Sequence, residues 1–396
     1  MQASNKLKVT LVLPHPLFGR DSGSIRTLEL LEYLPDNVEL TILEKVFDHK
    51  IKEENVVKFR NLNKKHNIKL ISINSMDHNI AINSTGKAYS PVVLWLIVPL
   101  IIKLEGFIFR KQLKFLNNQD VIYLFDNRDV ELIPHGCKAK IVGTNHGFVY
   151  ERIPRSKFKE LIVKSMGKMT LMGLIFHRIK YWHLFPGITD KVGYIPRNNI
   201  IIPIGIKFNE YFSRKGSSDV KFLFAGQLKE GKGIKTVLDA WNKGHIYNYG
   251  TLTICGWGPL GDELSKNPYK NVIFKGFVSD NNLRDLFGQS DIFVYPTKGD
   301  NFGFVILEAL ASGMHVLTTD IMSGLFDEFH EIGALEYIND DVPSFEERMR
   351  ISAENIIKIR AQSIEVRKIV EQYYGLDTVS NKLYNYFREI SEEGIK

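Results

Sequence analysis

The sequence predicts an α/β protein of two domains, each built around a parallel β-sheet. A buried strand, a glycine-containing loop and a helix follow one another twice, from residue 8 and again from residue 220. Residues 291–320 add a strand–loop–helix–strand unit of the same kind. Because parallel strands are joined by helical crossovers, this alternation is typical of a sheet covered by helices on both faces. A chain of 396 residues is long enough for two such domains, each with its own core.

The strands expected in the first half are short apolar runs bounded by polar residues or turn formers. A helix is expected from Ser24, because Ile25, Leu28 and Leu31 recur on one face. The polar segment 74–90 is expected to be a loop. The strands are expected at residues 8–13, 38–43, 68–73, 121–125 and 140–144.

The second half alternates strands and helices more regularly. The helix expected over 303–312 is almost wholly apolar and should therefore be buried, with Gly313 as its C-terminal cap. The last expected helix places Val379, Leu383 and Phe387 on one face. Strands are expected at 220–225, 251–255, 272–274, 292–295 and 315–319, and helices from 234 and over 283–287, 303–312, 344–374 and 378–393.

Composition narrows the class of protein. Apolar residues make up 44% of the chain, which argues against disorder. The two cysteines, Cys137 and Cys255, lie far apart, so neither a disulfide framework nor a cysteine-based metal site is predicted. The longest apolar run, 91–102, is about half of the ~20 residues that a membrane span needs. No signal peptide is visible, so we expect a cytoplasmic protein that does not span a membrane.

Charge is distributed unevenly between the two halves. Residues 1–206 contain 30 Lys and Arg against 18 Asp and Glu, whereas residues 207–396 contain 22 against 27. A basic half joined to an acidic half predicts an anionic partner for the first half only.

Two carboxylates stand out in the unit 291–320. Asp300 lies in the loop before the apolar helix, and Glu308 lies within that helix. A helix N-terminus favours phosphate, and Gly303 would let a ligand approach its backbone closely. The unit could therefore hold a phosphorylated ligand, with Glu308 accepting hydrogen bonds from ligand hydroxyls. In the alternative, Glu308 pairs with a nearby Arg or Lys, and Asp300 is a solvated loop residue.

Residues 300–303 and 308–313 resemble the acidic-x7-Glu signature of glycosyltransferase family 4, with Asp300 in place of the usual Glu. Such enzymes are retaining and metal-independent, use nucleotide-sugar donors and have the GT-B fold. The resemblance implies two Rossmann-like domains that face a central cleft, and a C-terminal helix that returns to the first. It is strong over residues 220–335 and loose over 8–206. It implies an acceptor-binding domain at 1–206, a nucleotide-sugar-binding domain at 207–376 and the returning helix at 377–396.

The resemblance also assigns roles around this signature. Asp300 would bind hydroxyls of the donor sugar, and Glu308 would bind the ribose diol. Backbone N–H groups would hold the sugar and the diphosphate, and they belong to Asn301, Phe302, Gly303, Phe304 and Val305.

Further positions match the family in the other loops. Lys232 matches a lysine that clamps the diphosphate, but Gln227 stands where the family has an arginine. We hypothesise that Lys229, in the same loop, supplies the missing charge. In the family, two further turns lie beside the nucleotide and its base. The positions of this chain that match them are Gly256, Gly258, Phe277 and Val278.

Three residues of the first half match family positions near the donor. Gly23 would bring a backbone N–H to the diphosphate, and Gly19 is the alternative. In a different interpretation, both glycines merely serve the turn. His146 would contact the donor sugar at the rim of the cleft, or it caps a strand end through a satisfied hydrogen bond.

Two stretches, 91–116 and 151–185, combine apolar residues with cations; the second carries eight Lys and Arg against two Glu. If they form long helices, they resemble interfacial segments that bind an anionic membrane surface. The alternative is a pair of core helices with a solvated basic face.

The sequence therefore predicts a metal-independent glycosyltransferase that needs no cofactor beyond its nucleotide-diphosphate sugar donor. It would transfer the sugar with retention to a hydroxyl of a glycan or lipid-linked acceptor in glycan biosynthesis. Two locations stay open, the cytoplasm itself and a peripheral place on the cytoplasmic face of a membrane. A nucleotide-sugar epimerase, a hydrolase or a non-catalytic nucleotide-sugar-binding protein of the same fold are the alternatives. Nucleic acid is not expected as a partner, because the second half is acidic.

Overall fold

The computed structural model describes residues 6–19, 22–46, 51, 53–75, 98–144, 165, 168–173, 176–187, 194–213, 219–300 and 302–393. These residues form two compact units. Unit 1 takes the described residues up to Pro203 and again from Leu376, and unit 2 takes the described residues from Ile204 to Gly375. Each unit is described by itself.

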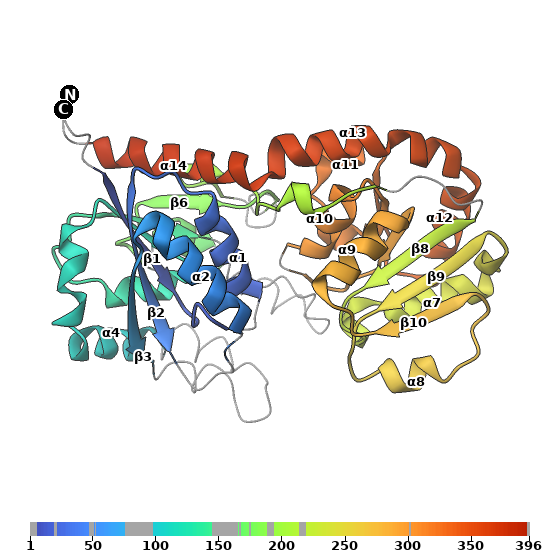
Figure 1. Ribbon diagram of the computed structural model, residues 1–396, viewed down its shortest axis with the longest axis horizontal. Helices are drawn as coiled ribbons and strands as arrows, with labels where there is room; N and C mark the ends of the chain where they lie inside the picture. The colour runs from blue at the N-terminus through green and yellow to red at the C-terminus, as the bar shows by residue number, and fades with distance from the viewer. Residues whose placement is uncertain are drawn as a thin grey trace. The chain divides into compact units, whose positions relative to one another are not determined.

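Unit 1 is built on a seven-stranded sheet in the order β3-β2-β1-β4-β5-β6-β7 (Figure 1). Neighbouring strands pair in parallel throughout. The strands are β1 (Leu7–Leu13), β2 (Val38–Val46), β3 (Lys69–Asn74), β4 (Val121–Leu124), β5 (Lys140–Thr144), β6 (Tyr181–Leu184) and β7 (Asn199–Ile201).

The helices of unit 1 come from both ends of the chain. The C-terminal helix α14 (Leu376–Glu392) places Val379, Leu383 and Phe387 in the same buried cluster as β1 and β4. This confirms the prediction that the last helix returns to the first domain. Among its described residues, unit 1 also contains α1 (Ser22–Glu32), α2 (Glu53–His66), α4 (Val98–Ile108) and the short 3-10 helices η2 (Gln112–Asn118) and η3 (Asn127–Leu132).

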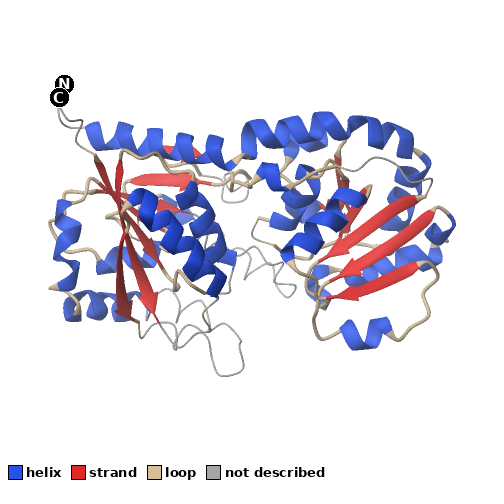
Figure 2. Cartoon of the chain, in the orientation of Figure 1, coloured by secondary structure: helices blue, strands red, loops and turns tan. Residues whose placement is uncertain are grey.

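Unit 2 has a six-stranded parallel sheet in the order β10-β9-β8-β11-β12-β13, and Figure 2 shows helices around it. Its strands are β8 (Val220–Ala225), β9 (Gly250–Cys255), β10 (Val272–Gly276), β11 (Ile292–Tyr295), β12 (His315–Thr319) and β13 (Leu335–Ile338). Its α-helices are α7 (Ile234–Lys243), α8 (Gly261–Ser265), α9 (Asp280–Gln289), α10 (Phe304–Ala311), α11 (Asp327–Glu331), α12 (Val342–Glu354) and α13 (Ile356–Tyr374). Its 3-10 helices are η4 (Phe208–Glu210), η5 (Glu230–Lys232), η6 (Ile246–Asn248) and η7 (Asp320–Met322).

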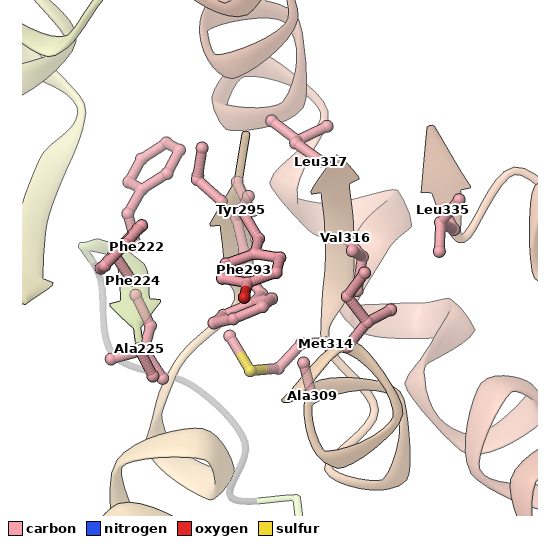
Figure 3. Packing of buried hydrophobic residues seen from close by; sticks show 14 of the residues in the cluster. Phe222, Phe224, Ala225, Phe293, Tyr295, Ala309, Met314, Val316, Leu317 and Leu335 are labelled. Atoms are coloured by element: carbon pink, nitrogen blue, oxygen red, sulfur yellow. The ribbon is translucent and has the colours of Figure 1, made fainter. Parts of the chain in front are cut away.

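The core of unit 2 gathers where β8, β11, β12 and α10 meet (Figure 3). Ile306, Leu307 and Ala309 of α10 are fully buried, as expected for an almost wholly apolar helix. Phe293 stacks on Tyr295 at a centroid distance of 5.7 Å. The strand and helix around Asp300 and Glu308 are therefore held by a tightly packed interior.

Three expectations about local structure are wrong. Residues 181–184 are a buried strand rather than part of a long helix, because Tyr181, Trp182, His183 and Leu184 all pack inside the sheet. The helix expected over 344–374 is two helices separated at Asn355, whose side chain and N–H both bond the carbonyl of Ile351. The first helix starts at Ser22, two residues before the expected start. Most of the expected loop 74–90 lies outside the described residues.

The two segments that lead into and out of unit 2 are tied together inside that unit. Ile206 pairs with Gly375 in a parallel bridge, and the Ile206 N–H donates to the Tyr374 carbonyl at 2.8 Å. Both passages of the chain between the units are therefore anchored at one place.

His183 gives unit 1 a pH-dependent stability. Its Nε2 faces the Ile202 carbonyl at 2.9 Å and so carries the proton, while Nδ1 accepts from the Tyr123 hydroxyl at 2.6 Å. Burial lowers the pKa of His183 from 6.5 to about 4, although the hydrogen bond to Ile202 acts in the opposite direction. As the pH falls below 6.5, the unfolded chain takes up the proton first, so stability is lost down to about pH 4.

We predict that His183→Gln, whose amide can bond both neighbours, reduces the fall in melting temperature between about pH 7 and pH 4.5. Thermal denaturation at the two pH values measures this. His135→Gln is the matched control, because His135 is exposed, and it should follow the wild type. An equal fall in wild type and His183→Gln would contradict the assignment.

Candidate functional site

The candidate site lies where the connections of unit 2's sheet change direction. β8 and β11 are neighbours at its centre, yet the chain leaves β8 toward β9 and leaves β11 toward β12 on the other side. In parallel α/β sheets, ligands bind outside the carboxyl ends of the strands at such a switch point. The loops that follow β8 and β11 contain Lys232 and Asp300, respectively.

Lys232 and Asp300 form an ion pair. Lys232 Nζ lies 2.7 Å from Asp300 Oδ2, which also accepts a hydrogen bond from the Tyr295 hydroxyl at 2.9 Å. Asp300 Oδ1 accepts from the Gly303 N–H at 3.2 Å. Only 23% of the Asp300 side chain is exposed, so the alternative of a solvated loop residue is wrong.

The surroundings keep Asp300 ionised. Burial by itself would raise the pKa of Asp300, but the Lys232 charge and the hydrogen bonds from Lys232, Tyr295 and Gly303 lower it. Burial and the Asp300 carboxylate raise the pKa of Tyr295, which therefore stays a hydroxyl donor. The site thus holds a fixed anion beside a fixed cation.

Lys232 retains the capacity to bind a ligand. Its Nζ donates to Asp300 and to the Gly299 carbonyl at 3.1 Å, and it lies 5.5 Å from the Tyr295 ring centre. An ammonium group has three N–H bonds, of which these two acceptors use two. The third can be donated to an anion bound between the two loops.

The two loops are packed against each other through Gly233. This residue precedes α7 with φ +72°, and a Cβ there would lie 2.0 Å from the Pro296 carbonyl oxygen. The Lys298 N–H bonds the Gly231 carbonyl at 2.9 Å in the same contact. Gly303, also left-handed, precedes α10 in the corresponding place. The N-termini of α7 and α10 thus begin at the two loops that carry Lys232 and Asp300.

The loops after β9 and β10 extend this edge. A Cβ on Gly256 would lie 1.8 Å from the Gly226 carbonyl oxygen, and the Leu228 N–H bonds the Trp257 carbonyl at 2.9 Å. A Cβ on Gly258 would lie 2.5 Å from the Leu228 carbonyl oxygen. These contacts place Gly256 and Gly258 beside the loop that contains Gln227 and Lys229.

Side chains in these loops differ in their accessibility. Gln227 is exposed, and Lys229 is half-buried just before η5. Phe277 is 75% exposed, whereas Val278 is partly buried against the core. An exposed aromatic ring at the end of a strand offers a flat apolar face to a ligand.

Glu308 is half-buried in α10 and accepts a hydrogen bond from the Tyr211 hydroxyl at 2.8 Å. The Arg284 guanidinium lies 5.7 Å from the Tyr211 ring centre and forms an ion pair with Glu210 at 2.6 Å. Arg284 therefore contacts the ring of Tyr211, while the hydroxyl of Tyr211 orients the Glu308 carboxylate.

The backbone positions that follow Asp300 are only partly described. The Phe302 side chain packs inward on Phe326 at a centroid distance of 5.3 Å, and Phe304 and Val305 pack against the core. Phe302 is buried, whereas Phe304 and Val305 are half-buried, and the predicted role of their backbone N–H groups in donor binding stays a prediction. The Gly303 N–H is already donated to Asp300. Asn301 lies outside the described residues.

The first-half candidates belong to unit 1 or lie outside the described residues. Gly23 lies in the first turn of α1 rather than in the loop before it. Gly19 donates its N–H to the Pro16 carbonyl at 3.2 Å, and its own carbonyl accepts from Asn55, so it serves its own turn. His146 lies outside the described residues.

Tyr295 and Tyr211 were not predicted as site residues. Tyr295 ends a wholly buried strand, and a buried tyrosine hydroxyl usually has a hydrogen-bond partner. The sequence could therefore have predicted that this hydroxyl meets a polar group of the following loop. Tyr211 lies 97 positions from Glu308 and had no such signal. The described residues contain no group of three or more His, Cys, Asp or Glu that could hold a metal ion.

Comparison with known proteins relates unit 2 to sugar-transferring enzymes. Residues 219–354 match the family model "Glycosyl transferases group 1". An uncharacterized glycosyltransferase of Methanocaldococcus jannaschii is 33% identical over 119 residues, which cover 28% of this chain and 30% of that protein. The alpha-galactosylglucosyldiacylglycerol synthase of Streptococcus pneumoniae is 30% identical over 118 residues, covering 27% and 30%. The chain thus spans under a third of the length of these relatives.

Similarity to solved structures extends over nearly the whole chain. The crystal structure of Anabaena HepE in complex with UDP and glucose aligns with a TM-score of 0.62 at 13% identity, covering 96% of this chain and 99% of that one. At this identity the likeness defines the fold, which is GT-B, and the predicted fold class is confirmed. Membership of the retaining family 4 stays a prediction.

We predict that Gly233→Ala destabilises unit 2, whereas Gly231→Ala in the same loop does not. The left-handed backbone alone costs a residue with a Cβ about 1–2 kcal/mol, and the Pro296 carbonyl blocks the added atom. Gly231 has no positive φ, and no described atom lies within 4 Å of an added Cβ. Urea denaturation measures both variants, and equal stabilities would refute the packing described for the two loops.

Proposed function

We propose that this chain is a retaining glycosyltransferase that moves a sugar from a nucleotide-diphosphate donor to an acceptor hydroxyl. The observation that carries the proposal is the Lys232–Asp300 pair at the switch point of unit 2. The glycosyltransferase match over residues 219–354 supports it. So does the structural likeness to a protein solved with UDP and glucose.

Each charged group has a proposed part in donor binding. Lys232 and the N-termini of α7 and α10 hold the diphosphate. Asp300 accepts three described hydrogen bonds, and since a carboxylate offers about four acceptor sites, one remains for a sugar hydroxyl. Glu308, oriented by Tyr211, binds the ribose diol. Phe277 and Val278 lie on the side of the base.

The reaction follows from where charge develops. The bond between the anomeric carbon and the diphosphate oxygen breaks, and the acceptor oxygen forms a bond to the same face of that carbon. The acceptor proton passes to an oxygen of the departing β-phosphate. Lys232 and the helix N–H groups stabilise the leaving diphosphate, which is where preorganised donors accelerate a reaction most. Neither a metal nor a further cofactor is required in this scheme.

The acceptor and the location are also proposals. The basic first half fits an acceptor that is a glycan or a lipid-linked glycan, reached from the cytoplasmic side of a membrane. An epimerase or a hydrolase would use the same donor site. Product analysis with and without an acceptor separates these reactions, and NMR of the product anomer tests retention, since an inverted product would contradict the scheme.

We predict that Lys232→Met lowers donor affinity roughly tenfold or more, because a hydrogen bond to a charged group contributes about 1.5–3 kcal/mol. A thermal-shift panel of nucleotide sugars identifies the donor, since a ligand present at about 100 times its Kd stabilises by roughly 2.7 kcal/mol. Lys243→Met is the matched control, because Lys243 is exposed in the last turn of α7, at the opposite end from the proposed diphosphate site. If the two variants bind the donor equally well, the site is wrongly assigned.

We predict that Lys229→Ala also weakens donor binding and slows turnover, because Gln227 leaves the loop one cation short. Gln227→Arg should act in the opposite direction, since the exposed side chain leaves room for a guanidinium near the diphosphate. Unchanged affinity and turnover in Lys229→Ala would show that this residue does not replace the missing arginine.

We predict that Glu308→Ala abolishes most transfer activity while circular dichroism and the melting curve stay close to the wild type. The half-buried carboxylate accepts a hydrogen bond from the buried Tyr211, so the change removes this hydrogen bond, worth about 0.5–1.5 kcal/mol, and leaves the packed apolar side chains of α10 in place. Wild-type turnover in this variant would refute its role in binding the donor.

A further inference from the structure

α4 is fixed on unit 1 by one face. Val98, Ile102 and Glu105 are buried, and the Glu105 carboxylate accepts a hydrogen bond from the Ser75 hydroxyl at 3.2 Å. A Cβ on Gly106 would lie 2.9 Å from the Glu131 carbonyl oxygen, so the helix packs directly on the backbone of η3. These contacts determine which side of α4 faces the solvent.

The outer face of α4 is apolar. Four large side chains are more than half exposed: Leu100 (66%), Leu104 (53%), Phe107 (66%) and Ile108 (55%). Their spacing of three and four residues places them in one stripe along the helix. An exposed apolar stripe of this kind marks an interaction surface, since water-facing helices normally present polar residues.

The exposed charges in the stretch of chain that carries this stripe have one sign. From residue 98 to 118, the exposed charged residues are Lys103, Arg110, Lys111 and Lys114, all cations. The only acid in that range, Glu105, is fully buried. The Arg110 guanidinium lies 5.3 Å from the Phe107 ring centre, at the end of the stripe. An apolar stripe beside cations complements a surface with apolar chains beneath anionic headgroups.

We propose that the Leu100–Leu104–Phe107–Ile108 stripe of α4 docks the protein on an anionic lipid surface. The helix has 11 residues, about 16 Å in length at 1.5 Å per residue, so it lies in the interface rather than crossing it. Among the described helices, none is long and apolar enough to span a membrane. A soluble polyanion would satisfy the cations but would leave the apolar stripe in water.

The position of α4 in unit 1 relates the proposed docking surface to the edge of the sheet where a ligand would bind. Glu105 contacts Ser75, one residue beyond the carboxyl end of β3, and Gly106 packs on η3, which follows β4. α4 therefore lies beside the edge of unit 1 where parallel sheets bind ligands. The proposal rests on the proposed function in one respect: the surface would present a membrane-anchored acceptor to that edge.

Flotation of the full chain with liposomes tests the docking. We expect the wild type to float with vesicles of phosphatidylglycerol and phosphatidylcholine but not with pure phosphatidylcholine. The double variant L104S/F107S should lose at least tenfold in partitioning at constant salt. Ile357→Ser is the matched control, because Ile357 is 84% exposed on α13 of unit 2, and it should float like the wild type.

A second readout separates insertion from simple charge attraction. The chain has four tryptophans of its own, so the readout is the difference in emission between Phe107→Trp and the wild type, which should shift to the blue when anionic vesicles are added. The proposal is overturned if no variant of the stripe changes flotation, if the tryptophan stays in water, or if L104S/F107S instead converts a dimer into a monomer. Melting curves confirm that the variants fold. The nucleotide-sugar donor should raise the melting temperature of the stripe variants as much as that of the wild type. A loss of vesicle binding then cannot be due to damage at the donor site.

Discussion

The ion pair between Lys232 and Asp300 joins the two loops on which the candidate site depends. The residues are 68 positions apart, yet the order of strands in unit 2 makes β8 and β11 neighbours. Tyr295 supports both partners, since its hydroxyl bonds the carboxylate and its ring lies beneath the ammonium. Because the Lys232 side chain is already held in place, binding a phosphate costs little further conformational entropy, which is the advantage of preorganisation.

Close backbone packing explains why the loops keep this arrangement. Gly233 and Gly256 lie against the carbonyl groups of Pro296 and Gly226 at distances that admit no side chain. Consecutive loops at the carboxyl edge of unit 2 are thus locked to one another, and beneath them lies the apolar core around α10. The loops that carry Lys232 and Asp300 therefore have closely packed backbones, and the proposed chemistry depends on a few side chains in them.

Much of this fold could be predicted from local patterns. Short apolar runs located β5, β8, β11 and β12 to the residue, because buried parallel strands are nearly continuous in apolar residues. β6 was missed, since Tyr181–Leu184 follows a stretch in which cations and apolar residues alternate as in a helix. In the site, glycine spacing located the loops, but the contacts of Asp300 with Lys232 and of Glu308 with Tyr211 depend on tertiary structure. Such long-range pairs carry no signal in one sequence.

We expect an activated sugar to bind with its diphosphate between the loops after β8 and β11. The decisive test is a crystal structure of the protein with the nucleotide-sugar donor that binds best in the thermal-shift panel. The quantity to measure is the distance from Lys232 Nζ to the nearest phosphate oxygen. We expect a charge-assisted hydrogen bond of about 2.7–2.9 Å, with Asp300 still within reach of Lys232. A diphosphate bound elsewhere, with Lys232 bonded only to Asp300 and Gly299, would contradict it.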